Sequence, residues 1–476
     1  MKSENKQVCE DFEPPLRFLI QIDLVTLIAM SDLLGRLLLE EPLVAKQVIQ
    51  EVVHLSVKAL GQLPYISGEQ VQVTIRLQSF PSVPDVCMGP DTKVTGLARM
   101  QGVLVARTAP GKYVVSAVYR CPVATCKNSR GRRSTRLLVT SPRCRLCGSD
   151  LEEVPRARDI GDQVVGFLLP HGALTAVAKG RHQALMVCFT DDLTCDLELG
   201  VDYSVVGYND SDMFHTWRVS RWRSPYTMLT QELPLLVLPP AIHQLYLGVS
   251  ECSPQSPWLF VVSLAACIGS DFYPGDTFLH LKLGLLLSLA SQGCSRPVPV
   301  LAVGAETLVA SRLMCRAGAL AQRYVPVTSL GLFSSVGGVE HVDDNKSCWC
   351  EAGALLFSAT GVCHLGDWAK LKQATARSHI QSAVESGVVP IETTGLLASG
   401  PSSATTIYPL RSSVWTYQAP PRGNKPSERA QLKTLIKSPK APQHLVTSAI
   451  HCRQRWETRA SVGLKAGCHA ITQSGQ

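Results

Sequence analysis

The pattern of apolar and polar positions along this chain changes character several times. Residues 16–23 read as a strand, and apolar residues then recur at helical spacing, most clearly over 42–60. That stretch carries one apolar face made of Val44, Val48, Val52, Val53, Leu55, Val57 and Leu60. We therefore expect a small helical domain over residues 1–63.

From Val71 the period of the pattern changes to two. Alternating stretches at 71–77, 94–107 and 112–120 are separated by proline and glycine turns, and similar stretches follow at 181–193 and 200–207. Short alternating strands divided in this way are typical of a small β-barrel. We expect a barrel domain over residues 64–223.

A proline-rich stretch at 224–255 predicts a linker, and two apolar helices are expected after it, at 258–274 and at 276–291 with Asp276 as the N-cap. A buried-strand pattern at 298–303 then breaks at Gly304 into an amphipathic helix. Strand, glycine and helix in this order favour an α/β domain, which we expect over residues 256–420.

The strand-glycine-helix stretch has the shape of a nucleotide-binding P-loop. A working P-loop has the spacing GxxxxGK[ST], because glycines let backbone N–H groups wrap the phosphates while a lysine neutralises their charge. Gly304 and Ser311 fit this spacing, whereas Val309 stands at the second glycine and Ala310 at the lysine. An ordinary βα turn would show the same pattern, so both interpretations remain open.

The most specific chemical motif is a set of four cysteines. Cys121 and Cys126 are followed, after seventeen intervening residues, by Cys144 and Cys147. Two close pairs of thiolates suit a tetrahedral Zn²⁺ site, and four protein ligands leave no open position for catalysis. The spacing predicts a structural zinc ribbon over 121–147, with four unconnected thiols as the alternative.

The cysteine usage and the chain ends bear on location. Seventeen cysteines without a secretory signal indicate reduced thiols inside the cell rather than disulfides. No window holds 18 consecutive apolar residues, so we expect no contact with a membrane. His451, Cys452, Cys468 and His469 lack the spacing of a second metal site.

The net charge of +8 is concentrated near the end of the sequence. Residues 421–476 hold ten Lys or Arg against two Glu, so residues 1–420 balance to zero. A basic, disordered tail suggests a polyanionic partner, although a merely solvated tail has the same composition. The ribbon tip is also basic and could meet phosphates or remain a solvated loop, through Arg130, Arg132, Arg133 and Arg136.

Residues 217–223, Trp-Arg-Val-Ser-Arg-Trp-Arg, interleave indoles with guanidinium groups. Such a combination could stack on single-stranded nucleic acid. Alternation also describes an ordinary half-buried strand, which we consider the simpler interpretation.

Residues 351–371 add a second resemblance, to the minichromosome maintenance (MCM) family of AAA+ helicases. GVCHLGDWAKL at 361–371 is similar to the family's Walker B strand, but Gly366 replaces the magnesium-binding aspartate and Asp367 the catalytic glutamate. Residues 377–395 resemble the helix and pre-sensor hairpin, with Thr393 at the place of the DNA-tracking lysine. The resemblance covers residues 16–417.

This resemblance implies an OB-fold barrel with an inserted zinc ribbon, followed by an AAA+-like domain whose nucleotide site, at Gly304, Ser311 and Asp367, is degenerate. Zinc is the implied cofactor, and ATP is doubtful. A divergent member of this kind implies a nuclear, catalytically degenerate scaffold in meiotic homologous recombination and double-strand-break repair. Its implied partners are DNA, single-stranded or in recombination intermediates, and other MCM-like or recombination proteins.

Two other classes of protein remain open at this point. A subunit of an active ATP-dependent helicase complex would have to borrow catalytic groups from its neighbours, since phosphoryl transfer relies on charge contacts that are missing here. A zinc-ribbon transcription or RNA-binding factor would account for the cysteines and the basic tail. It would not account for residues 283–395.

Overall fold

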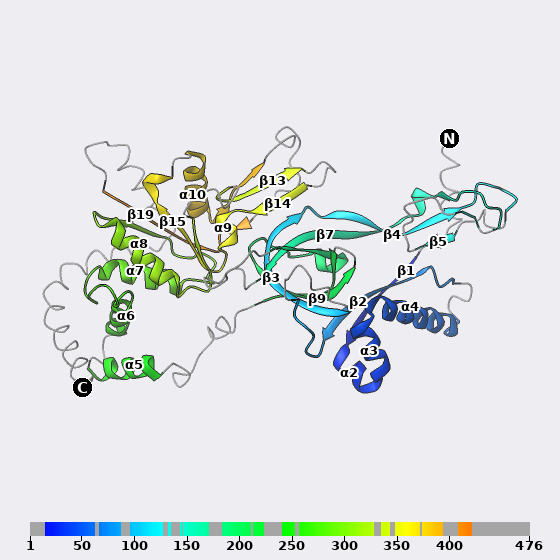
Figure 1. Cartoon of the computed structure of the whole chain (residues 1–476), viewed down its shortest axis with the longest axis horizontal. Coiled ribbons are helices and arrows are strands. Elements are labelled where there is room, and N and C mark those ends of the chain that lie inside the picture. Colours follow the sequence, from blue (N-terminus) through cyan, green and yellow to red (C-terminus); the bar gives the residue numbers. More distant parts are fainter. Residues whose placement is uncertain are drawn as a thin grey trace. The chain divides into compact units, whose positions relative to one another are not determined.

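The structure is a computed structural model of the 476-residue chain (Figure 1), which divides after Gln418 into two units. The residues that it describes are 15–61, 66–86, 96–126, 132–134, 143–144, 146–170, 183–210, 213–222, 240–252, 257–327, 335–342, 348–371, 374–393 and 408–420. The expected basic tail, 421–476, lies outside these residues. All elements below belong to the first unit.

The first elements form a helical layer on a two-stranded parallel sheet. Strand β1 pairs with β2 from Leu16 opposite Val71 onward, and three helices lie between them in sequence. The side chain of Asp23 accepts hydrogen bonds from the N–H groups of Val25 and Thr26 and caps the first helix. The bounds are β1 (Leu16–Asp23), α2 (Leu24–Met30), α3 (Asp32–Glu40), α4 (Pro42–Ala59) and β2 (Val71–Ser79).

Two expectations for this region are wrong. Among the described strands β2 pairs only with β1, so it is not a strand of the barrel sheet, although it shares a hydrophobic core with Val206 and Trp217 of that sheet. Helix α4 also has two apolar faces instead of one. Its inner face, with Ile49, Val53 and Val57, packs on the core, whereas the valines at 44, 48 and 52 are exposed together with Leu55.

Five strands form a closed ring of pairings, β3-β7-β8-β10-β9 and back to β3. All of these pairs are antiparallel except β8 with β10. The interior is apolar, with Leu104, Val164, Leu168 and Phe189 fully buried. The bounds are β3 (Leu97–Thr108), β7 (Asp159–Pro170), β8 (Leu185–Thr190), β9 (Asp202–Asp210) and β10 (Met213–Arg221).

Strand β4 (Gly111–Arg120) extends from the ring and leads to the cysteines. It pairs with β7 and also with two short strands, β5 (Arg132–Ser134) and β6 (Glu152–Glu153). The ribbon is therefore an excursion from the barrel sheet between β4 and β7.

The second sheet is parallel and has the order β11-β19-β15-β12. Its core includes Trp415, which is fully buried and donates from its indole N–H to Ser288 Oγ at 2.8 Å. Helices α7 and α8 pack on this core through Leu285, Leu313 and Met314. The strand bounds are β11 (Val300–Val303), β12 (Tyr324–Pro326), β15 (Val362–Asp367) and β19 (Ser413–Gln418).

The helices of this region depart from expectation at three places. The helix expected over 258–274 ends at Ala266. The expected linker, 224–255, contains helix α5, and α7 starts at Leu279 after Phe278, whose φ is 56°, so Asp276 does not cap it. Within the described residues, none of the helices is long and apolar enough to span a bilayer. The helix bounds are α5 (Pro240–Cys252), α6 (Pro257–Ala266), α7 (Leu279–Ala290), α8 (Thr307–Gly318), α9 (Ala354–Phe357) and α10 (Ala374–Ser386).

The barrel sheet continues into the C-terminal half of the first unit. Strand β14 pairs with the end of β3, with Trp349 opposite Thr108, and β13 and β17 follow outward from it. Strand β16 pairs with β18, and β17, which ends at Thr393, pairs with β13. Residues 394 and 395, the end of the hairpin expected within 377–395, lie outside the described residues, so that hairpin remains a prediction. The bounds are β13 (Gly338–Val342), β14 (Cys348–Ala352), β16 (Val388–Val389), β17 (Ile391–Thr393) and β18 (Tyr408–Pro409).

A buried ion pair joins the barrel to the parallel sheet region. Arg323 donates to Asp202 Oδ2 at 2.5 Å and to the carbonyl oxygens of Gly200 and Phe357 at 2.6 and 2.8 Å. Gly200 has a φ of +79°, and a Cβ added there would lie 1.7 Å from Leu356 O. The two backbones therefore approach each other too closely for any other residue.

Candidate functional site

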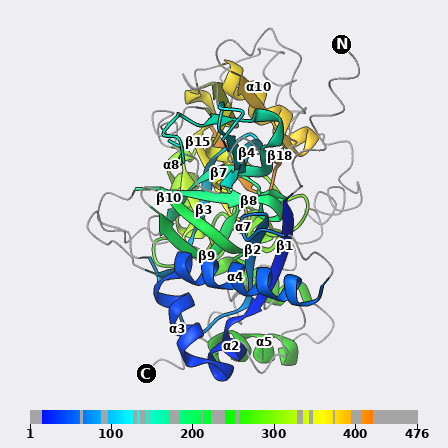
Figure 2. The same ribbon diagram turned by 90° about the vertical axis from the view of Figure 1, so that its right-hand side faces the viewer.

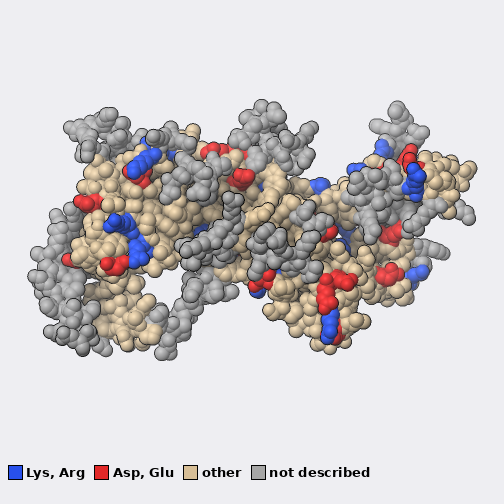
Figure 3. Space-filling view, viewed as in Figure 1, with Lys and Arg blue, Asp and Glu red and all other residues tan. Residues whose placement is uncertain are grey.

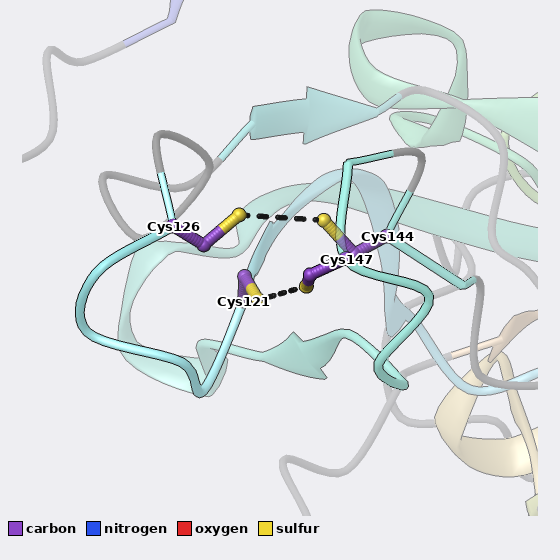
Figure 4. Close-up of side chains that lie close together, drawn as sticks. All are labelled: Cys121, Cys126, Cys144 and Cys147. Atoms are coloured by element: carbon purple, nitrogen blue, oxygen red, sulfur yellow. Dashed lines mark hydrogen bonds between the residues drawn. The ribbon is translucent and has the colours of Figure 1, made fainter.

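The four cysteines of the ribbon converge (Figure 4), with their sulfur atoms all within 4.8 Å of one another. The Sγ atoms of Cys121 and Cys147 are 3.3 Å apart, and those of Cys126 and Cys144 are 3.7 Å apart. A tetrahedral site with Zn–S bonds of about 2.3 Å places its sulfurs about 3.8 Å apart. The cluster could therefore hold a metal ion, and its donor set is compatible with zinc.

A tight turn positions the second cysteine pair. Gly148 N–H donates to Cys144 O at 2.8 Å, and Cys144 N–H donates to Ser149 O at 2.7 Å. Gly148 has a φ of +74°, a left-handed conformation that glycine adopts without strain. The first pair is organised by its own backbone bond, from Cys126 N–H to Val123 O at 3.0 Å, despite the four-residue gap.

The pKa values of two thiols in the cluster are shifted in opposite directions. Burial raises the pKa of Cys121 to about 12, whereas hydrogen bonding with Ser149 lowers the pKa of Cys147. A buried thiolate needs a compensating charge, and a coordinated metal cation supplies it.

Two of the four ribbon-tip arginines lie on strand β5. Strand β5 places the backbone of Arg132 and Arg133 beside β4, with Arg133 opposite Val118. Their side chains lie outside the described residues, as do Arg130 and Arg136. Their predicted contact with phosphates remains a prediction.

The connection at the strand-glycine-helix stretch is short. Strand β11 ends at Val303 and α8 begins at Thr307, so the turn consists of residues 304–306. The N–H of Ala310 donates to Glu306 O at 3.1 Å, within the helical ladder. Val309 is buried in the core. The expected alignment with a phosphate loop therefore places positions 309–311 within α8, where the N–H of Ala310 is already bonded to Glu306 and is not free to bind a phosphate.

The charge at this turn is also unfavourable for a nucleotide. Glu306 occupies the N-cap position of α8 and is exposed, and its side chain makes no capping hydrogen bond. A carboxylate there stabilises the helix through the macrodipole but repels phosphate from the same N–H groups.

The predicted residues of the nucleotide site are only partly brought together. Gly304 N–H donates to Gln418 O at 3.1 Å, and Asp367 lies opposite the neighbouring Tyr417, so Gly304 and Asp367 flank the end of β19. Ser311 lies in the second turn of α8. The carboxylate of Asp367 accepts from Ala369 N–H at 3.0 Å and caps the short 3₁₀ turn Trp368–Lys370.

Gly366 has a backbone conformation that favours glycine. Its φ is +74°, and the register of β15 on β19 shifts between His364 and Gly366. A residue with a Cβ is strained in this conformation. The backbone is therefore adapted to glycine at the very position where the family pattern has a metal-binding side chain.

Sequence reasoning missed His364 on the same strand. Its Nδ1 lies 2.5 Å from the hydroxyl of Tyr324, and burial lowers its pKa to about 4. Nothing in the sequence distinguishes this residue from any other histidine in an apolar strand.

Of the interleaved indoles and guanidinium groups at 217–223, those at 217–221 belong to strand β10, and residue 223 lies outside the described residues. Trp217 is buried and meets Tyr208 edge-on. Arg218 donates to Leu77 O, and Arg221 pairs with Glu198. A buried indole cannot stack on a base, so the simpler interpretation is confirmed for Trp217.

Comparison with known proteins shows what this chain is similar to. The chain is a mixed α/β protein that resembles MCMDC2, a divergent MCM-family protein, and it has a cysteine cluster that could hold a metal ion. The family description "MCMDC2, N-terminal domain" matches residues 1–80. Minichromosome maintenance domain-containing protein 2 of rat is 27% identical over 430 residues, and the mouse and human proteins are 26% and 24% identical.

The chain spans less than two thirds of the length of these relatives. The aligned region covers 84% of this chain but 62% of the length of each of these relatives. The expected family resemblance is confirmed, and the activity and partners of a whole relative are not thereby those of this chain.

Proposed function

We propose that this chain is a catalytically degenerate MCM-like protein that serves as a DNA- or protein-binding scaffold in meiotic homologous recombination and double-strand-break repair. The observation that carries the degenerate part is the turn at 304–306, which is short, acidic and followed at once by a helix. The recombination role rests on the family resemblance.

Finer features of the fold are part of this proposal. The ring of five strands with one parallel pair supports an OB-fold. Four parallel strands with a strand-glycine-helix turn at the edge support an AAA+-like domain. The four converging thiols support zinc as the metal.

The absence of ATP turnover is the first testable part. Without a lysine at position 310 and an aspartate at 366, the phosphates lose a cation and magnesium loses a ligand. Such contacts are each worth several kcal/mol in a transition state. Purified chain should neither bind ATP nor hydrolyse it, by fluorescent-nucleotide titration and by phosphate release. Turnover that disappears in the Ser311→Ala or Asp367→Ala variant would contradict this.

The DNA-binding part of the proposal assigns contact to the ribbon-tip arginines and the basic tail. Figure 3 shows acidic and basic side chains interspersed over the described surface in that view, with no broad basic area among them. Each phosphate contact adds about 0.7 to 0.9 to the slope of log affinity against log salt. Replacing Arg130, Arg132, Arg133 and Arg136 by Ala, and deleting 421–476, should flatten that slope on single-stranded DNA.

A matched variant separates the two possible DNA surfaces. Thr393 stands at the family's hairpin lysine, at the end of β17. If Thr393→Glu weakens binding while the arginine and tail changes do not, the C-terminal half is the DNA surface. Absence of binding at low salt would favour a scaffold that meets DNA through partner proteins.

The cellular part requires a genetic test. Cells lacking this protein should enter meiosis, form double-strand breaks and retain repair foci, and a tagged chain should be nuclear. Rescue by the Ser311→Ala/Asp367→Ala variant is expected for a scaffold. Failure of that variant to rescue, together with ATP-dependent unwinding by a reconstituted complex, would instead support a subunit of an active helicase.

A further inference from the structure

The outer side of the N-terminal helices is unusually apolar. Ten of the 22 large hydrophobic side chains that are exposed in the described part of the chain belong to residues 15–61. They include Met30 and Leu33, which are 74% and 82% exposed. An exposed apolar patch on a folded domain marks a surface where something binds.

Helix α4 gives this surface a direction. Val44, Val48, Val52 and Leu55 follow one another at intervals of four, four and three residues, so they lie within about 80° of the helix circumference. They are between 39% and 56% exposed, while the opposite face packs on the core. In Figure 2 the helix crosses the front of the molecule. We call these four residues the outer stripe.

The rim of the outer stripe is predominantly acidic. Glu51 lies about 20° from Val44 on the helix, and Glu40 and Glu41 stand at its N-terminal end. All three are exposed, and Lys58 is the basic residue at the other end. An apolar stripe with an acidic rim is complementary to an apolar stripe with a basic rim.

The acidic rim disfavours other occupants. An interfacial membrane helix carries Lys and Arg on its polar face, because lipid headgroups are often anionic. A second copy would pair stripe to stripe about a two-fold axis near residue 50, and the two Glu51 carboxylates would then meet close to that axis.

We propose that the outer stripe of α4 binds an amphipathic helix of a partner protein whose apolar side is flanked by Lys or Arg. The partner helix packs against α4 with Val48 and Val52 at the centre of the contact. Glu41 and Glu51 favour a partner with positive charge beside its apolar side. This inference does not depend on the degenerate nucleotide site or on DNA binding.

The test uses the full chain and two synthetic peptides of about five helical turns. Both carry leucine at helical spacing, and they differ only in having Lys or Glu on the flanks. Fluorescence anisotropy should show the Lys peptide binding at least about tenfold more tightly than the Glu peptide, with a preference that shrinks at high salt. Equal binding of the two peptides would overturn the proposal.

Three variants locate the surface. Val48→Asp/Val52→Asp should weaken the Lys peptide more than about tenfold, whereas Leu320→Asp, at another exposed leucine, should not change it. Glu41→Lys/Glu51→Lys should reverse the preference to the Glu peptide. This charge reversal leaves the stripe intact. It therefore tests the proposal even if circular dichroism shows that the double valine variant has lost its helix.

Two controls distinguish the other occupants. Sedimentation of the full chain should show no dimer that Val48→Asp/Val52→Asp dissolves, since such a dimer would assign the stripe to a second copy. Anionic phosphatidylserine vesicles should not bind through the stripe, and co-flotation abolished by the same variant would assign it to a membrane. Either result would overturn the proposal.

Discussion

The ribbon has all four of its candidate metal ligands, whereas the strand-glycine-helix turn lacks residues that a P-loop needs. The ribbon keeps four thiols within 4.8 Å of one another, including a buried one whose pKa is raised by burial. The turn keeps its strand and helix, but its loop is three residues long and its cap is a glutamate. One region has its complete donor set, and the other has the scaffold without the charges.

The difference follows from how each site is assembled. The ribbon ligands come from one stretch of 27 residues, 121–147, and the site requires only that four side chains converge. A nucleotide site requires a loop conformation, a cation and a metal ligand from separate strands. Loss of any one of these removes the function while the hydrophobic core under it remains.

The largest effect is expected at the ribbon. Cys144→Ser should abolish metal binding, and because structural zinc contributes on the order of 10 kcal/mol in small modules, the ribbon should unfold locally. Metal content by mass spectrometry and limited proteolysis provide the measurement. Cys267→Ser, at an exposed cysteine outside the cluster, should keep the metal. Native protein purified without any zinc would contradict the assignment.

The next effect tests whether the barrel and the parallel sheet unfold independently. Arg323→Met removes the cation from a buried pair with Asp202, and breaking such a pair costs about 3–5 kcal/mol. Unfolding by urea should show this loss for barrel and parallel sheet together, in one transition. Arg323→Met/Asp202→Leu should recover part of it. Two separate transitions in the native chain would mean that the regions are stabilised separately.

A third effect concerns His364 on β15 and depends on pH. His364 has a folded pKa of about 4, below its ordinary 6.5, so the unfolded chain takes up the proton first as the pH falls. The free energy of unfolding should therefore fall by up to about 3 kcal/mol between pH 6.5 and pH 4 from this group. His364→Asn should flatten that dependence, and Tyr324→Phe should keep it. Equal slopes in His364→Asn and native protein would contradict the burial argument.

The smallest effect concerns the residues of the proposed degenerate nucleotide site. Gly366→Asp should cost about 1–2 kcal/mol, because the left-handed backbone at this position strains a residue with a Cβ. Ala310→Lys should change stability little, since it places a lysine on an ordinary helical turn. Even the double variant should not hydrolyse ATP. Measurable turnover would mean that the turn at 304–306 can open into a phosphate loop.

The sequence was informative where a pattern is local. Strand β1, the ends of α4 and the convergence of the four cysteines could be predicted from periodicity and spacing. The single apolar face expected for α4 was wrong, because periodicity counts apolar positions without showing which of them find a partner. The placement of β2 with the helices was also missed, since β strands of equal pattern differ only in what they pair with.

At the predicted nucleotide site the sequence showed which residues depart from the P-loop pattern but not the geometry of the turn. Alignment to GxxxxGK[ST] located Val309 and Ala310, but it could not show that α8 already begins at Thr307. Long-range contacts such as Arg323 with Asp202 have no local signal at all. Such contacts are decided by tertiary packing, which a residue pattern does not encode.

The pairing of β14 with β3 has a consequence for synthesis of the chain. Trp349 and Thr108 are 349 − 108 = 241 positions apart, so the end of β3 leaves the ribosome long before its partner strand. At 5–20 residues per second the delay is on the order of 10–50 s. During that interval the end of β3 is an open sheet edge, and such edges attract other strands. Until β14 has been synthesised, the end of β3 is therefore open to binding by a chaperone or to pairing with a wrong strand.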